Sequence, residues 1–86
     1  MSLVMVIEDE EAIATLLSYN LEKEGYKVSV VNNGINAVSE VEKQHPSVII
    51  LDWMLPEISG VEICKLIRSK PDIKTIPIIM LTAKSQ

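Results

Sequence analysis

The chain has few features that would assign it to a specialised class of protein. Its single cysteine, Cys64, rules out an internal disulfide and is typical of a reducing compartment. Its 8 Lys and Arg residues form no cluster and its net charge is -4, which argues against nucleic-acid binding. No apolar run approaches the ~20 residues of a membrane span, and the first residues do not resemble a signal peptide. We therefore expect a cytoplasmic domain that contacts neither nucleic acid nor membrane.

The length of the chain limits it to one small domain. With 86 residues, of which 48% are apolar, it can fill one hydrophobic core but not two. A domain of this size buries only roughly 60% of the surface that its unfolded chain exposes, so we expect marginal stability. The sequence contains no internal repeat, low-complexity tract or linker.

The hydrophobic pattern alternates between strands and helices. Continuous or alternating apolar runs predict strands at 3–7, 27–31, 48–51 and 76–81. Between them, a helix is predicted at 11–24, another ends before Pro46, and a third follows a loop at 56–60. The apolar stripes predicted for these helices are Ile13, Leu16, Leu17 and Leu21; Ile35, Val38 and Val41; and Val61, Cys64 and Ile67. Alternation of this kind predicts an α/β fold with a parallel sheet covered by helices on both faces.

The two end strands of this pattern differ in character. The strand at 27–31 alternates polar and apolar residues, as an edge strand does, and Gly25 before it stands at a helix C-cap. The strand at 76–81 is as apolar as a central strand, yet the sequence supplies only one neighbour for it. We therefore expect the chain to associate with itself through the exposed edge of this fourth strand.

Acidic residues follow two of the predicted strands. The first strand runs into Glu8 and Asp9, the third ends in Asp52, and the fourth ends in Thr82. Ligands of open parallel sheets bind at the carboxyl ends of the strands, where neighbouring strands lie about 4.8 Å apart. If the first and third strands are neighbours, Asp9 and Asp52 face each other across a shared crevice.

Carboxylates gathered in this way repel one another unless a cation lies between them. Mg²⁺ suits the position, because it prefers oxygen ligands and is usually held by one or two carboxylates with water and phosphate. A carboxylate can also attack phosphorus to form an acyl phosphate. The hydroxyl of Thr82 could donate a hydrogen bond to a phosphoryl oxygen.

Three stretches resemble the strand ends of bacterial response-regulator receiver domains. They are 6–10 (VIEDE), 50–56 (ILDWMLP) followed by Gly60, and 78–83 (IIMLTA). The similarity covers essentially all 86 residues, in the same order and at the same spacing. The residues of these stretches are most similar to those of the OmpR/PhoB-type regulators, in particular the phosphate-regulon regulator. The resemblance implies a flavodoxin-like (CheY-like) three-layer fold with strand order 2-1-3-4, and residues 1–86 would form the N-terminal portion of the domain.

The resemblance also implies roles for individual residues. Asp52 would accept a phosphoryl group from a sensor histidine kinase, and Thr82 would be the switch hydroxyl. Asp9 and Asp52 would bind Mg²⁺ with their side chains, Met54 through its backbone carbonyl, and Glu8 mainly through a bound water. Lys84, like Met54, would tune the lifetime of the phosphoryl group. Such a domain is a signalling module rather than an enzyme, and in a parent protein it would control a DNA-binding transcription regulator.

One departure from the family leaves an alternative open. The family carries a phosphoryl-binding lysine at the end of a fifth strand, and this chain ends before that position. The alternative is a truncated interaction module or dimerising fragment that does not transmit phosphorylation. A phosphatase of the haloacid-dehalogenase type is disfavoured, because such enzymes need an acid two residues after the nucleophile, where this chain has Met54. Nucleotide binding is disfavoured because no glycine-rich loop follows the first strand.

Overall fold

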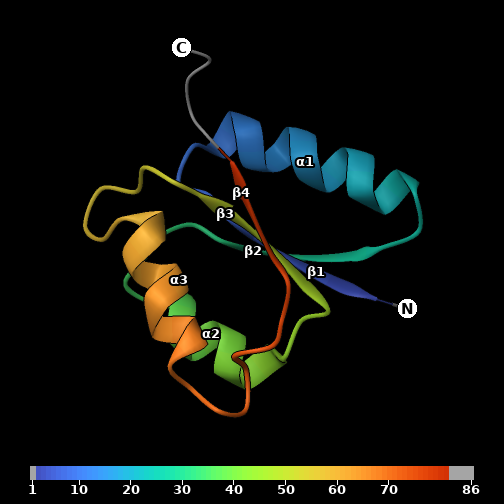
Figure 1. The fold of residues 1–86 in the computed structure, drawn as a ribbon. Helices are drawn as coiled ribbons and strands as arrows, with labels where there is room; N and C mark the ends of the chain where they lie inside the picture. The colour runs from blue at the N-terminus through green and yellow to red at the C-terminus, as the bar shows by residue number, and fades with distance from the viewer. Residues whose placement is uncertain (1, 82–86) are drawn as a thin grey trace.

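The computed structural model describes residues 2–81, in which strands and helices alternate along the chain (Figure 1). The strands are β1 (Leu3–Ile7), β2 (Lys27–Val31), β3 (Val48–Asp52) and β4 (Ile78–Leu81). The helices are α1 (Glu11–Lys23), α2 (Ala37–Gln44) and α3 (Gly60–Arg68). The predicted β-α-β-α-β-α-β order is therefore confirmed. None of the helices in this part of the chain is long and apolar enough to cross a membrane.

The strands form one parallel sheet in the order β2-β1-β3-β4. Helix α1 lies on one face of this sheet, and α2 and α3 lie together on the other, so that the domain has three layers (Figure 1). Both the predicted strand order and the three-layer arrangement are confirmed. Since β1 and β3 are neighbours at the centre, their carboxyl ends lie side by side.

The hydrophobic core lies mainly between the sheet and the α2–α3 layer. Side chains alternate between the two faces of a strand, and Met5, Ile49 and Leu51 point to this layer and are fully buried. Ile63 and Ile67 of α3 pack against them and are equally buried. The sheet is thus anchored by α3, whose N-terminus lies at the same end as the carboxyl end of β3.

Helix α1 covers the opposite face only in part. It packs on β1 and β2, and Ala14 is its buried residue, while Leu17 and Leu21 are half-buried. Ile13 and Leu16 are 39% and 62% exposed, so the predicted stripe is wrong at these two positions. The reason is that α1 lies over only two strands, so it buries a narrow strip formed by Ala14, Leu17 and Leu21. The side of α1 that faces β3 and β4 is left uncovered by the described residues.

The buried faces of the other two helices also differ from the prediction. Ile35 precedes α2 and is 66% exposed, whereas Val41 is fully buried as predicted. In α3, Val61 is 40% exposed and Cys64 is half-buried, while the predicted Ile67 shares the buried face with Ile63. Helix α3 begins at Gly60, and this start brings positions 60, 63 and 67 onto the sheet.

Two capping residues fix where helices begin and end. Gly25 has a positive φ of 97°, a conformation that side chains disfavour, and its N–H donates to the carbonyl of Glu22 at 3.0 Å, which confirms the predicted C-cap. At the start of α3, the hydroxyl oxygen of Ser59 accepts a hydrogen bond from the N–H of Glu62 at 3.1 Å.

Strand β4 has one neighbour within the described residues, as the sequence predicts. It pairs with β3, and its Ile79, on the α1 side of the sheet, is 53% exposed. Arg68 positions the chain that leads into β4, because its Nη1 donates hydrogen bonds to the carbonyls of Lys74 at 2.7 Å and Ile76 at 2.8 Å. Within residues 2–81, the outer edge of β4 and its α1-side surface are therefore uncovered.

Candidate functional site

The carboxyl ends of β1 and β3 bring the acidic residues together. Ile7 is aligned with Leu51 in the register of these strands, so Glu8 and Asp52 follow at equivalent positions. The chain then turns at Asp9 toward α1. Because Glu8 continues a strand buried on both faces, its side chain stays inside, and it is only 3% exposed.

Glu8, Asp9 and Asp52 form a compact group of carboxylates. One oxygen from each of the three lies within 4.8 Å of the others. Asp52 is 6% exposed and Asp9 is exposed, so the group opens to solvent on the Asp9 side. The predicted meeting of Asp9 and Asp52 at this edge is therefore confirmed.

Two backbone N–H groups orient the buried carboxylates. The N–H of Glu10 donates to Oε2 of Glu8 at 3.0 Å, and the N–H of Met54 donates to Oδ1 of Asp52 at 3.1 Å. In residues 2–81, the ion pairs between side chains do not involve Glu8, Asp9 or Asp52. Within the described residues, the negative charge of the group is therefore stabilised by backbone N–H groups rather than by cationic side chains.

The electrostatics of the group are visible in Glu8. Burial raises the pKa of its carboxyl above the ordinary value, and the negative charges of Asp52 and Asp9 add to this effect. The hydrogen bond from the N–H of Glu10 acts in the opposite direction and lowers the pKa. The net shift of the pKa is upward, so Glu8 binds a proton more readily than an ordinary glutamate does.

This donor set fits a small divalent cation. All three donors are carboxylate oxygens, two of them buried, and hard oxygen donors are what Mg²⁺ prefers. A cation at this position would offset the repulsion from Asp52 and Asp9, which adds to the effect of burial on the pKa of Glu8. Glu8, Asp9 and Asp52 would hold it and leave open positions toward solvent on the Asp9 side.

The loop after β3 is closed tightly beside Asp52. The N–H of Gly60 donates to the carbonyl of Trp53 at 2.7 Å, and the N–H of Trp53 donates to the carbonyl of Leu81 at 3.0 Å. A Cβ on Gly60 would collide with the carbonyl oxygen of Asp52 and lie 2.9 Å from Cα of Trp53. The sequence identified Gly60 as part of a motif but did not predict this contact, because only the fold shows that Gly60 lies against the backbone of Asp52 and Trp53.

Two further predicted residues have different outcomes. Thr82, with Lys84, lies outside the described residues. Met54 follows Asp52 closely and its side chain is 63% exposed, so its backbone rather than its side chain belongs to the site. A role for its carbonyl as a metal ligand stays a prediction.

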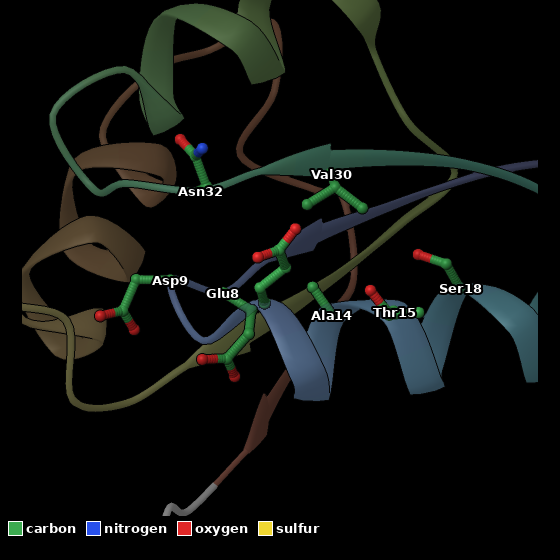
Figure 2. A pocket seen from close by; sticks show the side chains of 8 residues that line it. Glu8, Asp9, Ala14, Thr15, Ser18, Val30 and Asn32 are labelled. Atoms are coloured by element: carbon green, nitrogen blue, oxygen red, sulfur yellow. The ribbon is translucent and has the colours of Figure 1, made fainter.

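A groove extends from the acidic group along α1. It has a volume of about 540 Å³ and is lined by Glu8, Asp9, Thr15, Ser18 and Asn32, among others. Figure 2 shows Thr15 and Ser18 on α1 and Asn32 at the end of β2, on opposite sides of this groove. The sequence analysis looked for acidic residues after each strand and therefore did not select Asn32, which is polar but uncharged. Asn32 lies at the groove because β2 pairs with β1.

Replacing Glu8 by Gln tests whether the buried carboxylate of Glu8 destabilises the fold. The pKa of Glu8 is raised in the folded state, so its ionisation lowers the stability of the fold as pH rises through that pKa. At neutral pH the charge of Glu8 is therefore unfavourable for folding. Glu8→Gln should therefore raise the metal-free unfolding free energy at pH 7 by on the order of 1 kcal/mol, after solvent screening through the open side, and the melting temperature with it. The gain should vanish at low pH, where Glu8 is protonated in the wild type.

Thermal unfolding from pH 4 to pH 8, with and without Mg²⁺, measures both effects. Mg²⁺ should stabilise the wild type, since a ligand that binds the folded state favours it, and it should stabilise Glu8→Gln less. Glu62→Gln, on an exposed part of α3, is the matched control. Equal stabilities of Glu8→Gln and the wild type at every pH would contradict the buried, repelled carboxylate.

Comparison with known sequences gives a consistent picture. The family model described as "Response regulator receiver domain" matches residues 4–86. The phosphate regulon transcriptional regulatory protein PhoB of Rhizobium meliloti is 46% identical over 83 residues, which are 96% of this chain and 37% of that protein. The alkaline phosphatase synthesis transcriptional regulatory protein PhoP of Bacillus subtilis is 45% identical over 83 residues, 96% of this chain and 34% of that protein. The chain thus spans about a third of these relatives.

Solved structures show the same architecture. The response regulator TrrA of Thermotoga maritima, in complex with Mg²⁺–BeF, has a TM-score of 0.91 and 38% identity, and the match covers 99% of this chain and 72% of that one. The chemotaxis protein CheY4 of Vibrio cholerae has a TM-score of 0.91 and 31% identity, with 100% and 72% covered. The fold is therefore flavodoxin-like, of the CheY type.

Proposed function

Because this chain belongs to the response regulator receiver domain family, we propose that Asp52 is its phosphoryl acceptor and that a sensor histidine kinase is the donor. The observation that carries this proposal is the position of Asp52. It lies at the end of a central strand, 6% exposed, and within 4.8 Å of the Glu8 and Asp9 carboxylates. An aspartate with a purely structural role would not need two further acids beside it.

The hydrogen bonding of Asp52 supports its role as the attacking residue. Its Oδ1 accepts the N–H of Met54, which leaves Oδ2 as the atom that attacks phosphorus. A bond forms between Oδ2 and phosphorus while the bond from phosphorus to the donor histidine nitrogen breaks. The electron pair of that bond stays on the imidazole nitrogen, and Asp52 becomes an acyl phosphate.

We propose that Glu8, Asp9 and Asp52 hold Mg²⁺ during this transfer, with the carbonyl of Met54 as a further ligand. When bound, the ion supplies positive charge that offsets the charge of the phosphoryl oxygens. The carboxylates fit this role because they gather oxygen donors at a solvent-accessible edge. The Mg²⁺–BeF complex of the Thermotoga relative supports the proposal for that fold. Thr82 is proposed as the hydroxyl that hydrogen-bonds the phosphoryl group.

Incubation with phosphoramidate in Mg²⁺ tests acceptance of phosphate directly. We expect the intact mass to rise by one phosphoryl group, and this gain to disappear in EDTA. The adduct should be released by neutral hydroxylamine, because an acyl phosphate is labile to that nucleophile whereas a phosphoserine is not. An unchanged mass would favour the alternative, a module that binds partners without being phosphorylated.

In a longer parent protein, we propose that residues 1–86 form the N-terminal portion of the receiver domain and that phosphorylation controls an attached DNA-binding transcription regulator. Two observations support this. The two relatives carry the words "transcriptional regulatory protein" in their names, and each is about three times as long as the matched segment. We propose a signalling rather than an enzymatic role, in the cytoplasm, which is consistent with the single cysteine.

We also propose that the chain as it stands associates through β4. Strand β4 pairs only with β3 in the described part of the chain, and its residue Ile79 is 53% exposed. Strand edges that carry no charge readily pair with a second copy. Ile79→Lys should therefore reduce the association by about tenfold or more, since it places two cations close together at the paired edge.

Sedimentation velocity between 1 and 100 µM, as a rough working range for weak pairing, measures this association. Ile35→Lys is the matched control, because Ile35 is similarly apolar and exposed but precedes α2, near the opposite end of the sheet from β4. A wild-type chain that stays monomeric throughout would contradict the proposal, and so would equal effects of both substitutions.

A further inference from the structure

Strand β2 is the outer strand at the other end of the sheet, and within residues 2–81 it pairs only with β1. The N–H of Lys27 donates to the carbonyl of Ser2, and the carbonyl of Val31 accepts from Glu8, both at 3.0 Å. In a parallel ladder, alternate residues direct their N–H and C=O toward the same neighbour. The backbone groups of Val28 and Val30 therefore point out of the open edge.

The edge lacks the usual protection at its carboxyl-terminal half. Natural edge strands are blunted by charged residues, proline or a covering segment. In β2 the one charged residue is Lys27, at the start of the strand, and Val30 is 45% exposed. The free donors and acceptors near Val30 are thus available to an added strand.

Hollows border this edge on both faces of the sheet. On the α1 side, the groove of about 540 Å³ includes Thr15, Ser18 and Val30 (Figure 2). On the α2 side, a hollow of about 300 Å³ includes Val30, Glu40 and Gln44. Successive side chains of an extended peptide point to opposite faces, so two consecutive residues opposite Val30 would enter the two hollows.

The lining of the hollows favours positive charge. The α1-side groove carries Glu11 in addition to Glu8 and Asp9, and its walls include Ala14 and Val30, on which an aliphatic stem can lie. Ser18 Oγ, at this groove, has no hydrogen-bond partner in residues 2–81.

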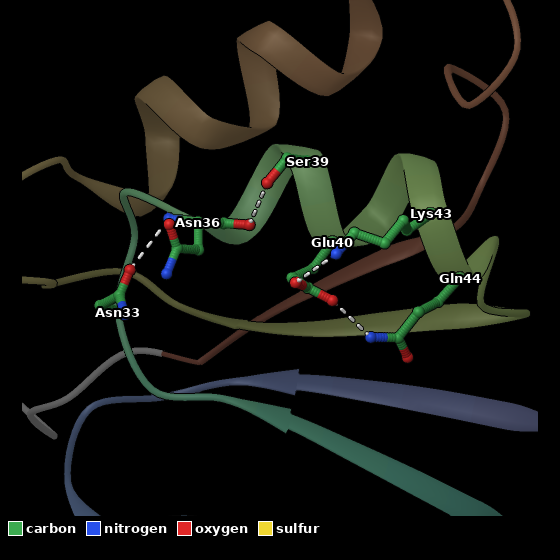
Figure 3. Close-up of polar contacts among 6 residues, drawn as sticks. All are labelled: Asn33, Asn36, Ser39, Glu40, Lys43 and Gln44. Carbon is green, nitrogen blue, oxygen red and sulfur yellow. Dashed lines mark hydrogen bonds and ion pairs between the residues drawn. The ribbon is translucent and has the colours of Figure 1, made fainter.

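The α2-side hollow carries an acid as well. Glu40 accepts hydrogen bonds from Gln44 at 2.7 Å and Lys43 at 3.4 Å (Figure 3), which lower its pKa and keep it charged. Lys43 offsets part of this charge through an ion pair at 3.4 Å, which solvent weakens because the Lys43 side chain is 72% exposed.

We propose that the open edge of β2 binds an extended segment of a partner protein that carries two adjacent basic residues, as an added strand. The backbone of Val28 and Val30 would pair with this segment. One basic side chain would reach Glu11 in the α1-side groove, and the next would reach Glu40 in the α2-side hollow. The α1-side groove begins at Glu8 and Asp9, but Asp52 is not among the lining residues of either hollow. The proposed contacts are to Val30, Glu11 and Glu40, so this inference does not depend on phosphorylation.

A second copy of the chain fits this edge less well. Its own β2 would bring one cation, Lys27, and the same carboxylates that line the hollows. Two copies that met at this edge would bring the acids of their hollows close together, and these like charges would repel each other. A partner of opposite charge has both the attraction and the side chains that the hollows accept.

NMR titration of the ¹⁵N-labelled 86-residue chain with a synthetic peptide tests the inference. The probe is a short threonine–valine peptide with two adjacent arginines at its centre, and the control has two glutamates in their place. We expect shifts centred on Val28 and Val30 and slowed exchange of their N–H groups with the arginine peptide alone. The titration contains no phosphodonor, so its failure and that of the acyl-phosphate experiment are distinguishable.

Two kinds of variant sharpen the test. Val30→Pro removes an outward N–H and should abolish binding while the fold is kept, because proline is tolerated where a strand N–H faces solvent. Glu11→Lys and Glu40→Lys leave the backbone unchanged, and each should weaken binding by about three- to tenfold. Binding that is unaffected by either charge reversal would overturn the inference. So would β2 shifts that grow with protein concentration in the absence of peptide, since these would identify a second copy as the occupant.

Discussion

Replacing Asp52 by Asn is expected to abolish the phosphoryl adduct completely, without unfolding the chain. Asn keeps an oxygen to accept the N–H of Met54, which is 3.1 Å from Oδ1 of Asp52. It loses the anionic oxygen that attacks phosphorus, and neutral amides are very weak nucleophiles toward phosphorus. The loss should therefore lie in chemistry rather than in structure.

The same substitution removes one of three carboxylates that lie within 4.8 Å of one another. The repulsion on Glu8 should fall, because Asp52 contributes to its raised pKa. Asp52→Asn should thus be at least as stable as the wild type without metal, and Mg²⁺ should stabilise it less.

Intact mass spectrometry after reaction with phosphoramidate measures the adduct, and thermal unfolding measures the two stability effects. The matched control is Asp72→Asn, because Asp72 is exposed near His45 and far along the chain from the acidic group. A full adduct on Asp52→Asn would place the acceptor elsewhere and would refute the proposed function. If Asp72→Asn also lost the adduct, the loss in Asp52→Asn could be explained by the removal of one negative charge and would not identify the attacking oxygen.

Replacing Gly60 by Ala is expected to cost about 3 kcal/mol of unfolding free energy, at the upper end for an overpacked site. The added Cβ would collide with the carbonyl oxygen of Asp52 and lie 2.9 Å from Cα of Trp53. Both obstacles are backbone atoms, which cannot rotate away as a side chain can. Either α3 or the end of β3 must move, so the adduct on Asp52 should also form more slowly.

Gly34→Ala provides the comparison that isolates backbone obstruction. There the new Cβ would collide with Cγ2 of Ile58 and lie 3.1 Å from Cδ1 of Ile63, both of which belong to side chains. The nearest backbone atom, the carbonyl oxygen of Ile58, is farther away at 3.3 Å. The double variant Gly34→Ala with Ile58→Ala should therefore recover part of the loss of Gly34→Ala. No shortening of a side chain should recover Gly60→Ala.

Urea unfolding of these variants gives the free energies, and the rate of phosphoramidate labelling reports on Asp52. Gly25→Ala is a further control, because a Cβ there meets nothing within 4 Å and the cost is only the strain of φ 97°, roughly 1–2 kcal/mol. If Gly60→Ala were no more costly than Gly25→Ala, the close approach at Asp52 would be unimportant.

The sequence by itself determined the alternation of strands and helices and the residues of the acidic group. Strand periodicity and buried apolar runs are local, so they can be read along the chain. Glu8, Asp9 and Asp52 follow strands directly, and the carboxyl ends of parallel strands share one edge. Once β1 and β3 are neighbours, their meeting follows from the register alone.

The tertiary structure decided which apolar residues are buried. Leu16 and Val61 fit a helical stripe in the sequence, yet they are 62% and 40% exposed. The width of a buried stripe depends on how many strands lie beneath the helix and on the residue at which the helix starts. Neither quantity is encoded in the spacing of one helix's own residues.

The tertiary structure also decided the two contacts that matter most for the site and its surroundings. The approach of Gly60 to the backbone of Asp52 joins residues separated by a whole loop. The hollows beside Val30 arise where α1 and α2 flank an edge strand from opposite faces. A sequence lists donors and charges in order, but a carboxylate gains its pKa, and a strand edge its partner, from atoms that only folding brings within a few ångströms.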